Sequence, residues 1–329
     1  MTQRTFNHPL NINSGPLLAE FILQMATKPK TVIVIAGPTA VGKTSVAIQV
    51  AKHFHTEIIS ADSRQCYQEL NIGVARPSPE ELEEVKHYFI ASHTIHEKVN
   101  AATFEQYALE KVSAIFKTKD VAVMAGGTGL YIKAFCEGMD IIPDVPNQVR
   151  QKIIENYNQH GLQWLQQQVQ QLDSGYFEKG EVHNPQRLMR ALEVITATGK
   201  SILDYRKGSK AKRDFDIIKV ALELPKEQLH KNVNGRVDKM LEQGLLKEAR
   251  SLMSYQHLNA LQTVGYKEMY DYLDDKCSLE DAVELIKKNT RQYAKRQITW
   301  FRKDMEYVWL APRAEKIKEH LYDALQIYK

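Results

Sequence analysis

One short segment combines glycine, lysine and threonine at a spacing that suits phosphate binding. Residues 37–44 have the sequence GPTAVGKT and match the pattern G-x-x-x-x-G-K-[ST] at every fixed position. In such a loop the glycines let backbone N–H groups point at phosphate oxygens, the lysine neutralises charge, and the last hydroxyl can hold Mg²⁺. The predicted oligophosphate-binding residues are Gly37, Pro38, Thr39, Ala40, Val41, Gly42, Lys43 and Thr44, with Thr44 also the predicted Mg²⁺ ligand.

The elements on either side of this loop are those that the motif requires. Residues 31–36 form an uncharged, β-branched run, which predicts a buried parallel strand. Residues 45–54 place Val46, Val50 and Phe54 on one stripe, which predicts a helix. The helix N-terminus adds positive potential at the loop. The order strand, loop and helix therefore favours a true phosphate site over a chance glycine turn.

An acidic residue follows the second predicted strand, residues 56–60. In a doubly wound sheet the carboxyl ends of neighbouring strands line one crevice, which places Asp62 beside the phosphate loop. A carboxylate there can be a metal ligand, a general base or a helix N-cap, and spacing alone does not choose between them.

A third predicted strand, residues 121–125, ends in the sequence GGTGLY. The glycines suggest close approach of the backbone to a ligand, with the Thr128 hydroxyl as a donor. ATPases with this type of loop usually carry an acid at the end of an apolar strand to hold Mg²⁺ and its water. This strand ends in glycine, which argues against ATP hydrolysis.

The chain changes character after about residue 143. Residues 148–213 have helical spacing and no strand pattern, and the apolar residues 215–224 then return to strand character. Asn184 and Pro185 predict a helix N-cap and first turn, and Gly199 predicts its end. Near that start, Gln186, Arg187 and Arg190 suit phosphates and base edges, with a solvated surface as the alternative.

The strongest charge asymmetry lies near the end of the chain. A predicted helix over residues 284–306 has an apolar side, next to its basic side, that includes Ala294, Ile298, Phe301 and Met305. Cations without a local counter-charge repel one another unless a polyanion such as RNA neutralises them, and the alternative is an ordinary solvated helix. Between residues 287 and 303 there is no acid but seven cations: Lys287, Lys288, Arg291, Lys295, Arg296, Arg302 and Lys303.

Length and composition agree with a soluble α/β protein. The chain has 329 residues, a net charge of +4 and 43% hydrophobic residues. Three scattered cysteines, no signal sequence and no membrane-length apolar run predict a cytoplasmic protein. We predict a P-loop NTPase-like parallel sheet flanked by helices, with an all-helical insertion domain. The predicted divisions are an extension (1–29), a first part of the core (30–142), the insertion (143–214) and a second part of the core (215–329).

Several motifs, in a fixed order, resemble those of the bacterial tRNA dimethylallyltransferases. They are GPTAVGKT at 37–44, ADSRQCY at 61–67, GGTGLY at 126–131 and NPQRLMRALE at 184–193, followed by GRVDKML at 235–241 and VGYKE at 264–268. The resemblance covers roughly residues 30–310. Cys66 stands where the family often has valine, and the zinc finger of eukaryotic relatives is absent.

The resemblance implies transfer of a dimethylallyl group from dimethylallyl diphosphate to N6 of the adenosine just 3′ of the anticodon (position 37). The implied substrates are tRNAs that read codons beginning with U, the implied cofactor is Mg²⁺, and a monomer is expected. Nucleotide (ATP) binding by the loop stays open. The alternatives are a P-loop kinase of a nucleotide or small metabolite, and a non-catalytic RNA-binding protein with a vestigial loop.

The resemblance also implies roles for individual residues. The implied catalytic residues are Asp62 as the base that takes the N6 proton, Thr128 at the reacting end of the channel, and Arg236 on the diphosphate. The residues implied or predicted to contact tRNA are Asp62, Ser63, Arg64, Gln65, Thr128, Arg150, Gln186, Arg187, Leu188, Met189, Arg190, Lys288, Arg291 and Lys295.

Overall fold

The computed structural model describes residues 30–206, 208 and 210–325. The described residues form two compact units: a sheet unit, which runs up to Cys136 and resumes at Arg213, and a helical unit, Glu137–Lys212. The predicted extension, residues 1–29, lies outside the described residues. No helix in the described part of the chain is both long and apolar enough to cross a membrane.

The sheet unit is built on a six-stranded parallel sheet with the order β3-β2-β4-β1-β5-β6. This confirms the predicted fold class. The strand β3 has only two residues, because Phe89 and Ala91 have φ angles of 61° and 46°, which a strand cannot accommodate. The strands are β1 (Thr31–Ala36), β2 (Ile58–Ala61), β3 (His87–Tyr88), β4 (Val121–Gly126), β5 (Asp216–Leu222) and β6 (Val308–Leu310).

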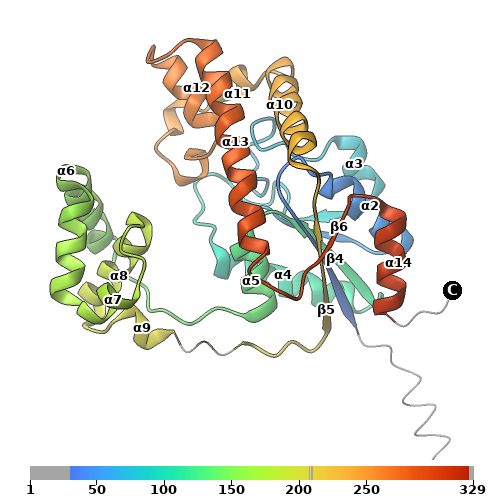
Figure 1. Cartoon of the computed structure of the whole chain (residues 1–329), viewed down its shortest axis with the longest axis horizontal. Coiled ribbons are helices and arrows are strands. Elements are labelled where there is room, and N and C mark those ends of the chain that lie inside the picture. The colour runs from blue at the N-terminus through green and yellow to red at the C-terminus, as the bar shows by residue number, and fades with distance from the viewer. Residues whose placement is uncertain (1–29, 207, 209, 326–329) are drawn as a thin grey trace, which may run out of the picture. The chain divides into compact units, whose positions relative to one another are not determined.

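Both faces of the sheet are covered by helices (Figure 1). Helices α2 (Lys43–His53) and α14 (Ala314–Ala324) bury their apolar side chains in one core, and α4 (Ala101–Ile115) and α5 (Gly129–Glu137) bury theirs in the other. Successive residues of a strand point to opposite faces, so β1 contributes to both cores.

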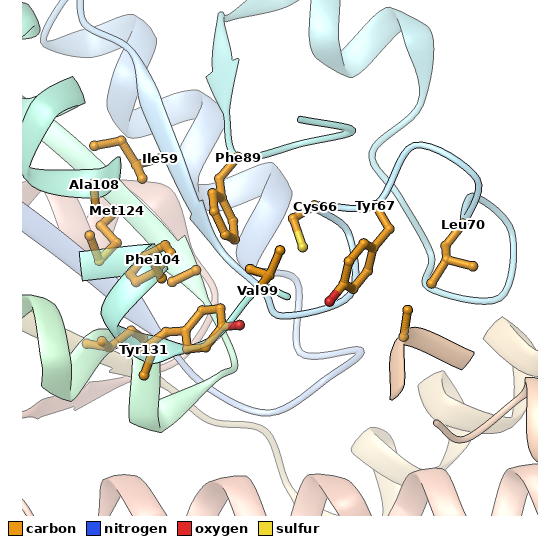
Figure 2. Close-up of a cluster of buried hydrophobic side chains, with 14 of the residues drawn as sticks. Ile59, Cys66, Tyr67, Leu70, Phe89, Val99, Phe104, Ala108, Met124 and Tyr131 are labelled. Atoms are coloured by element: carbon orange, nitrogen blue, oxygen red, sulfur yellow. The ribbon is translucent and has the colours of Figure 1, made fainter. Parts of the chain in front are cut away.

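An aromatic cluster fills the second core below the loop that follows β2. Phe104 lies 4.8 Å from the ring of Tyr131 and 5.0 Å from that of Phe89, measured between ring centroids. Figure 2 shows these rings beside Cys66 and Tyr67. Burial raises the pKa of the Cys66 thiol to about 12, so this cysteine acts as a small apolar residue. The cluster supports the segment that carries Asp62.

Helix starts follow local hydrogen-bond chemistry. Helix α4 begins directly after Asn100, because the Asn100 side chain accepts a bond from the Thr103 backbone and acts as the N-cap. The first helical segment after β2, α3 (Pro79–Glu84), is capped by Ser78 in a reciprocal bond with Glu81.

Four helices complete the sheet unit: α10 (Lys226–Glu242), α11 (Leu245–Ser251), α12 (Tyr266–Leu273) and α13 (Leu279–Phe301). Helix α13 packs along α10 and α12 (Figure 1). It ends before Met305, which is 91% exposed, so the prediction that the helix places Met305 on the same side as Ala294 and Phe301 is wrong.

The helical unit consists of α6 (Asn147–Leu172), α7 (Ser174–Lys179), α8 (Pro185–Thr198) and α9 (Ile202–Tyr205) around a separate core. Gly161, with φ 71°, breaks α6. As predicted, Asn184 caps α8 and Gly199 ends it in a left-handed conformation.

Candidate active site

The phosphate loop leaves β1 and forms the N-terminus of α2. Gly37 has φ 146° and Gly42 has φ 101°, conformations that favour glycine. A Cβ on Gly37 would lie 2.9 Å from the carbonyl oxygen of Leu222 in β5, so the strand spacing also requires a glycine there. The sequence thus specifies both the shape of the loop and its place against the sheet.

Lys43 is enclosed within this loop. Its Nζ donates a hydrogen bond of 2.7 Å to the Pro38 carbonyl. Burial, helped by the nearby Arg236 cation, lowers the Lys43 pKa to about 7, although Asp62 acts in the opposite direction. A dianionic or trianionic ligand would restore the charge on this lysine.

Asp62 and Thr128 meet where β2 and β4 end. The Thr128 hydroxyl accepts a 3.0 Å hydrogen bond from the Ser63 backbone. Asp62 Oδ1 accepts bonds from the backbones of Arg64 at 2.8 Å and Gln65 at 3.2 Å. Among the described residues, no group is hydrogen-bonded to the other oxygen, Oδ2. One oxygen therefore fixes the turn, while the other can accept a proton or a metal.

The glycines after β4 are required by the protein's own backbone. A Cβ on Gly126 would lie 2.2 Å from the Ala61 carbonyl oxygen, and one on Gly127 would lie 2.1 Å from the amide nitrogen of Gln297. We expected these glycines to allow close approach of a ligand. At these two positions the approaching groups are instead a neighbouring strand and a helix side chain.

Two adjoining cavities surround Asp62. The phosphate cavity, about 90 Å³, is lined by loop residues that include Lys43 and Thr44. The outer cavity, about 220 Å³, is lined by more apolar groups such as Met240, Val264 and Ile286. Six residues line both cavities: Thr39, Asp62, Val74, Ala75, Arg236 and Tyr293. A ligand in the phosphate cavity and another in the outer cavity would therefore meet beside Asp62.

Helix α10 supplies two side chains to the phosphate loop. Arg236 donates to the Thr39 hydroxyl at 3.3 Å, and Asn232 donates to the Ala40 carbonyl at 3.2 Å. Burial lowers the pKa of Arg236, and the Asp62 carboxylate partly offsets this. The Arg236 side chain lines both cavities.

Helix α13 contributes two residues that sequence reasoning did not assign to the site. Gln297 is 6% exposed, and its amide bonds to both the phosphate loop and the turn after β4. Tyr293 lines both cavities, and burial raises the pKa of its hydroxyl to about 12. A signal was present: Gln297 is a polar residue on the same helix stripe as Ala294 and Phe301.

A third unpredicted residue, Glu248 of α11, holds the loop that carries Val74 and Ala75. Its carboxylate accepts 2.9 Å bonds from the backbones of Ile72 and Gly73, and a 2.6 Å bond from the Tyr266 hydroxyl. Gln65 holds the same loop from within, because its amide donates 2.9 Å to the Ala75 carbonyl. The side-chain amide predicted to contact tRNA is thus already bonded to this loop.

The basic residues of α13 fall into two groups. Lys288 and Lys295 are exposed, whereas Arg291 donates to Asn234 at 2.6 Å. Lys287 pairs with Asp238 of α10 at 2.9 Å. Lys287 also pairs with Glu284 of α13 itself at 3.0 Å, and Arg302 lies 3.5 Å from Glu223. The expectation of cations without counter-charges is therefore wrong for Lys287 and Arg302, because the compensating acids lie outside residues 287–303.

In the helical unit, the predicted tRNA-contacting residues lie on α6 and α8. The carboxylate of Glu193, which is 3% exposed, lies 3.7 Å from Arg150 Nε and 3.2 Å from Arg190 Nη1. Gln186 and Arg187 are exposed, and Arg187 pairs with Glu181. Leu188 is 0% exposed and Met189 7%, so their side chains pack in the core of the helical unit, and contact of these two residues with tRNA stays a prediction.

The donor set near the loop suits a metal held largely by the ligand. Among the described residues, no three His, Cys, Asp or Glu side chains come together as a metal site. The Thr44 hydroxyl lines the phosphate cavity and is a hard oxygen donor. Mg²⁺ commonly binds with one or two protein oxygens, substrate phosphates and waters, so these residues fit it.

Comparison with known proteins places this geometry in a family. The family model described as IPP transferase matches residues 65–304. A tRNA dimethylallyltransferase from Bacteroides thetaiotaomicron is 43% identical over 292 residues, which cover 88% of this chain and 95% of that protein. The chain belongs to the tRNA dimethylallyltransferase family.

Solved structures of tRNA prenyltransferases agree with the assignment of this chain to the family. The tRNA isopentenylpyrophosphate transferase of Bacillus halodurans has a TM-score of 0.67 and 31% identity, covering 90% of this chain and 97% of that one. A eukaryotic dimethylallyltransferase acting on tRNA has a TM-score of 0.69 and 28% identity, covering 83% of this chain and 70% of that one.

Proposed function

We propose that this protein transfers a dimethylallyl group from dimethylallyl diphosphate to N6 of the adenosine at position 37 of tRNA. The observation that carries the proposal is the meeting of two cavities at Asp62, one lined by the phosphate loop and the other more apolar. The diphosphate would occupy the first, and an adenine drawn out of its stack would enter from the second.

The phosphate loop would act on the leaving group. As the bond from the allylic carbon to oxygen breaks, negative charge builds up on the diphosphate. Loop N–H groups, Lys43 and Arg236 can stabilise that charge, and the buried setting strengthens their effect. This explains a phosphate loop without the acid that ATP hydrolysis requires.

Asp62 would accept the proton from N6. The adenine lone pair is delocalised into the ring, so removal of a proton as the C–N bond forms lowers the barrier. Asp62 Oδ1 is held by two backbone N–H groups, which orients the carboxylate and leaves Oδ2 for the substrate. Thr128 follows β4, and its hydroxyl accepts a hydrogen bond from the Ser63 backbone of the Asp62 turn, so it would help orient the reacting groups.

The proposal includes Mg²⁺ as cofactor, with Thr44 and the diphosphate oxygens as its ligands. When bound, the ion would supply further positive charge at the leaving group. We further propose that a single chain acts on tRNAs reading codons that begin with U, in the cytoplasm.

The test is a reaction with purified components. Incubation with dimethylallyl diphosphate, Mg²⁺ and tRNA lacking the modification should yield N6-isopentenyladenosine, detected by mass spectrometry of tRNA nucleosides. Mapping the nuclease fragment should place it next to the anticodon. Phosphoryl transfer from ATP to a small metabolite, with no prenyl transfer to tRNA, would overturn the proposal in favour of a kinase.

A further inference from the structure

Gln297 is the one strongly buried polar side chain of the described part of α13. It is 6% exposed and lies between Ala294 and Phe301 on the stripe that faces the unit's interior. A buried amide costs free energy unless its donors and acceptor are satisfied. Its hydrogen-bond partners therefore indicate what the residue does.

Both partners belong to the active site. Gln297 Oε1 accepts a 2.8 Å hydrogen bond from the Thr39 backbone N–H, and Nε2 donates a 2.9 Å bond to the Gly127 carbonyl. Thr39 belongs to the phosphate loop, and Gly127 precedes the Thr128 turn. One amide thus joins two segments 88 residues apart in the chain, since 127 − 39 = 88.

The Gln297 amide lies in close contact with the backbone at Gly127. A Cβ at Gly127 would lie 2.1 Å from the Gln297 nitrogen. Arg236 and Asn232 hold the loop from α10 through Thr39 and Ala40. Among the described residues of α13, only Gln297 has a side chain that bonds both to the phosphate loop and to the turn before Thr128.

We propose that Gln297 is a positioning residue, whose amide holds the phosphate loop and the Gly127 turn at a fixed separation. The loop N–H groups would then be oriented for diphosphate while Thr128 stays beside Asp62. The residue itself need not touch the diphosphate. This inference rests on the proposed function for the identity of the ligand.

The main experiment replaces Gln297 with methionine, which keeps the volume but has no hydrogen-bonding amide. Calorimetric titration with inorganic diphosphate and Mg²⁺ should show affinity reduced by about tenfold to a hundredfold. Affinity for unmodified tRNA should stay within about twofold, because the exposed cations of α13 are unchanged. Gln292→Met, at an exposed position of the same helix, is the matched control.

A pH series with Gln297→Glu separates positioning from packing. A protonated glutamic acid can accept from Thr39 and donate to Gly127, whereas the carboxylate cannot donate. The ratio of its diphosphate affinity to that of the wild type should therefore rise as pH falls from about 8 to about 6. If Gln297→Met does not fold, this pH series alone tests whether Gln297 positions the loop and the turn through its hydrogen bonds.

Unchanged diphosphate affinity in Gln297→Met, or a flat pH ratio in Gln297→Glu, would overturn the inference. Equal losses of diphosphate and tRNA affinity would do so as well, because they indicate general disruption. Prenyl transfer by the wild type is measured separately, so failure of the proposed function can be told apart from failure of this inference.

Discussion

At the scale of single residues, Asp62 combines a structural and a chemical task on its two oxygens. Asp62→Asn keeps an oxygen that can accept the Arg64 and Gln65 backbone bonds, but it has no basic carboxylate. We expect turnover to fall by about a hundredfold to ten-thousandfold while tRNA affinity stays near that of the wild type. Single-turnover kinetics and filter binding measure the two quantities. Activity close to wild type would show that Asp62 is not the base.

We expect Lys43 to take up a proton when diphosphate binds, to an extent that depends on pH. Burial first, and Arg236 next, lower its pKa to about 7 in the free protein. Above pH 7 the free lysine is mostly neutral, and an anionic ligand favours its charged form, so binding of diphosphate at pH about 8 should take up about one proton at this group. Affinity contributed by Lys43 should correspondingly decline as pH rises above 7.

Calorimetry in buffers of different ionisation enthalpy measures that uptake. Diphosphate has protons of its own, so the informative quantity is the difference between the wild type and Lys43→Met. No difference between them would mean that the free lysine is already charged.

At the scale of elements, α13 carries exposed lysines on its outer surface. We expect Lys288→Ala together with Lys295→Ala to weaken tRNA binding and to reduce the slope of log affinity against log salt by about two. Lys276→Ala is the control, because Lys276 is already paired with Asp271 and Asp274. If the double substitution left the slope of log affinity against log salt unchanged, these lysines would not contact tRNA and α13 would be an ordinary solvated helix.

In the helical unit, Glu193 of α8 pairs with two of the arginines that are predicted to contact tRNA. This nearly buried carboxylate lies beside Arg150 and Arg190, so one acid orders cations from two helices of the helical unit. Glu193→Ala should destabilise this unit by about 1–2 kcal/mol, because it removes a buried side chain and two ion pairs to arginines that are half exposed. Chemical denaturation followed by circular dichroism would measure the loss. Glu178→Ala, at an exposed position of α7, is the control and should change little.

At the scale of the whole molecule, α14 shows how the C-terminal segment stabilises the sheet unit. Leu321 is 0% exposed and packs with Ile317 in the same core as α2, the helix that follows the phosphate loop. Leu321→Ala should cost about 2–5 kcal/mol of unfolding free energy, whereas Leu172→Ala at a 54% exposed position should cost much less. Comparable midpoints in thermal unfolding would contradict this.

The sequence predicted those parts of the site that are encoded locally. The phosphate loop, Asp62 and Thr128 each follow an apolar strand, and parallel strands bring their carboxyl ends together. The same logic predicted the sheet and the helical insertion. A helix after residue 313 was not predicted, since its pattern is short and mostly charged.

Gln297 and Glu248 could not be predicted in this way. Their roles depend on which backbone groups remain unpaired after the chain has folded, and these groups lie more than a hundred residues earlier in the chain. A glutamine or glutamate on a helix is ordinary in sequence. The tertiary packing of α11 and α13 gives these two residues their importance.

The position of α13 determines which kind of defect a substitution at each of its residues should cause. The helix bonds to the loop and the turn through one side and presents Lys288 and Lys295 on another. A saturation screen from residue 286 to 300 should therefore yield two interleaved kinds of defect, repeating with the turn of the helix. Changes that weaken RNA binding and reduce its salt dependence would alternate with changes that slow the chemical step on RNA already bound. Within residues 286–300, the two phenotypes should therefore alternate with the helical repeat of α13.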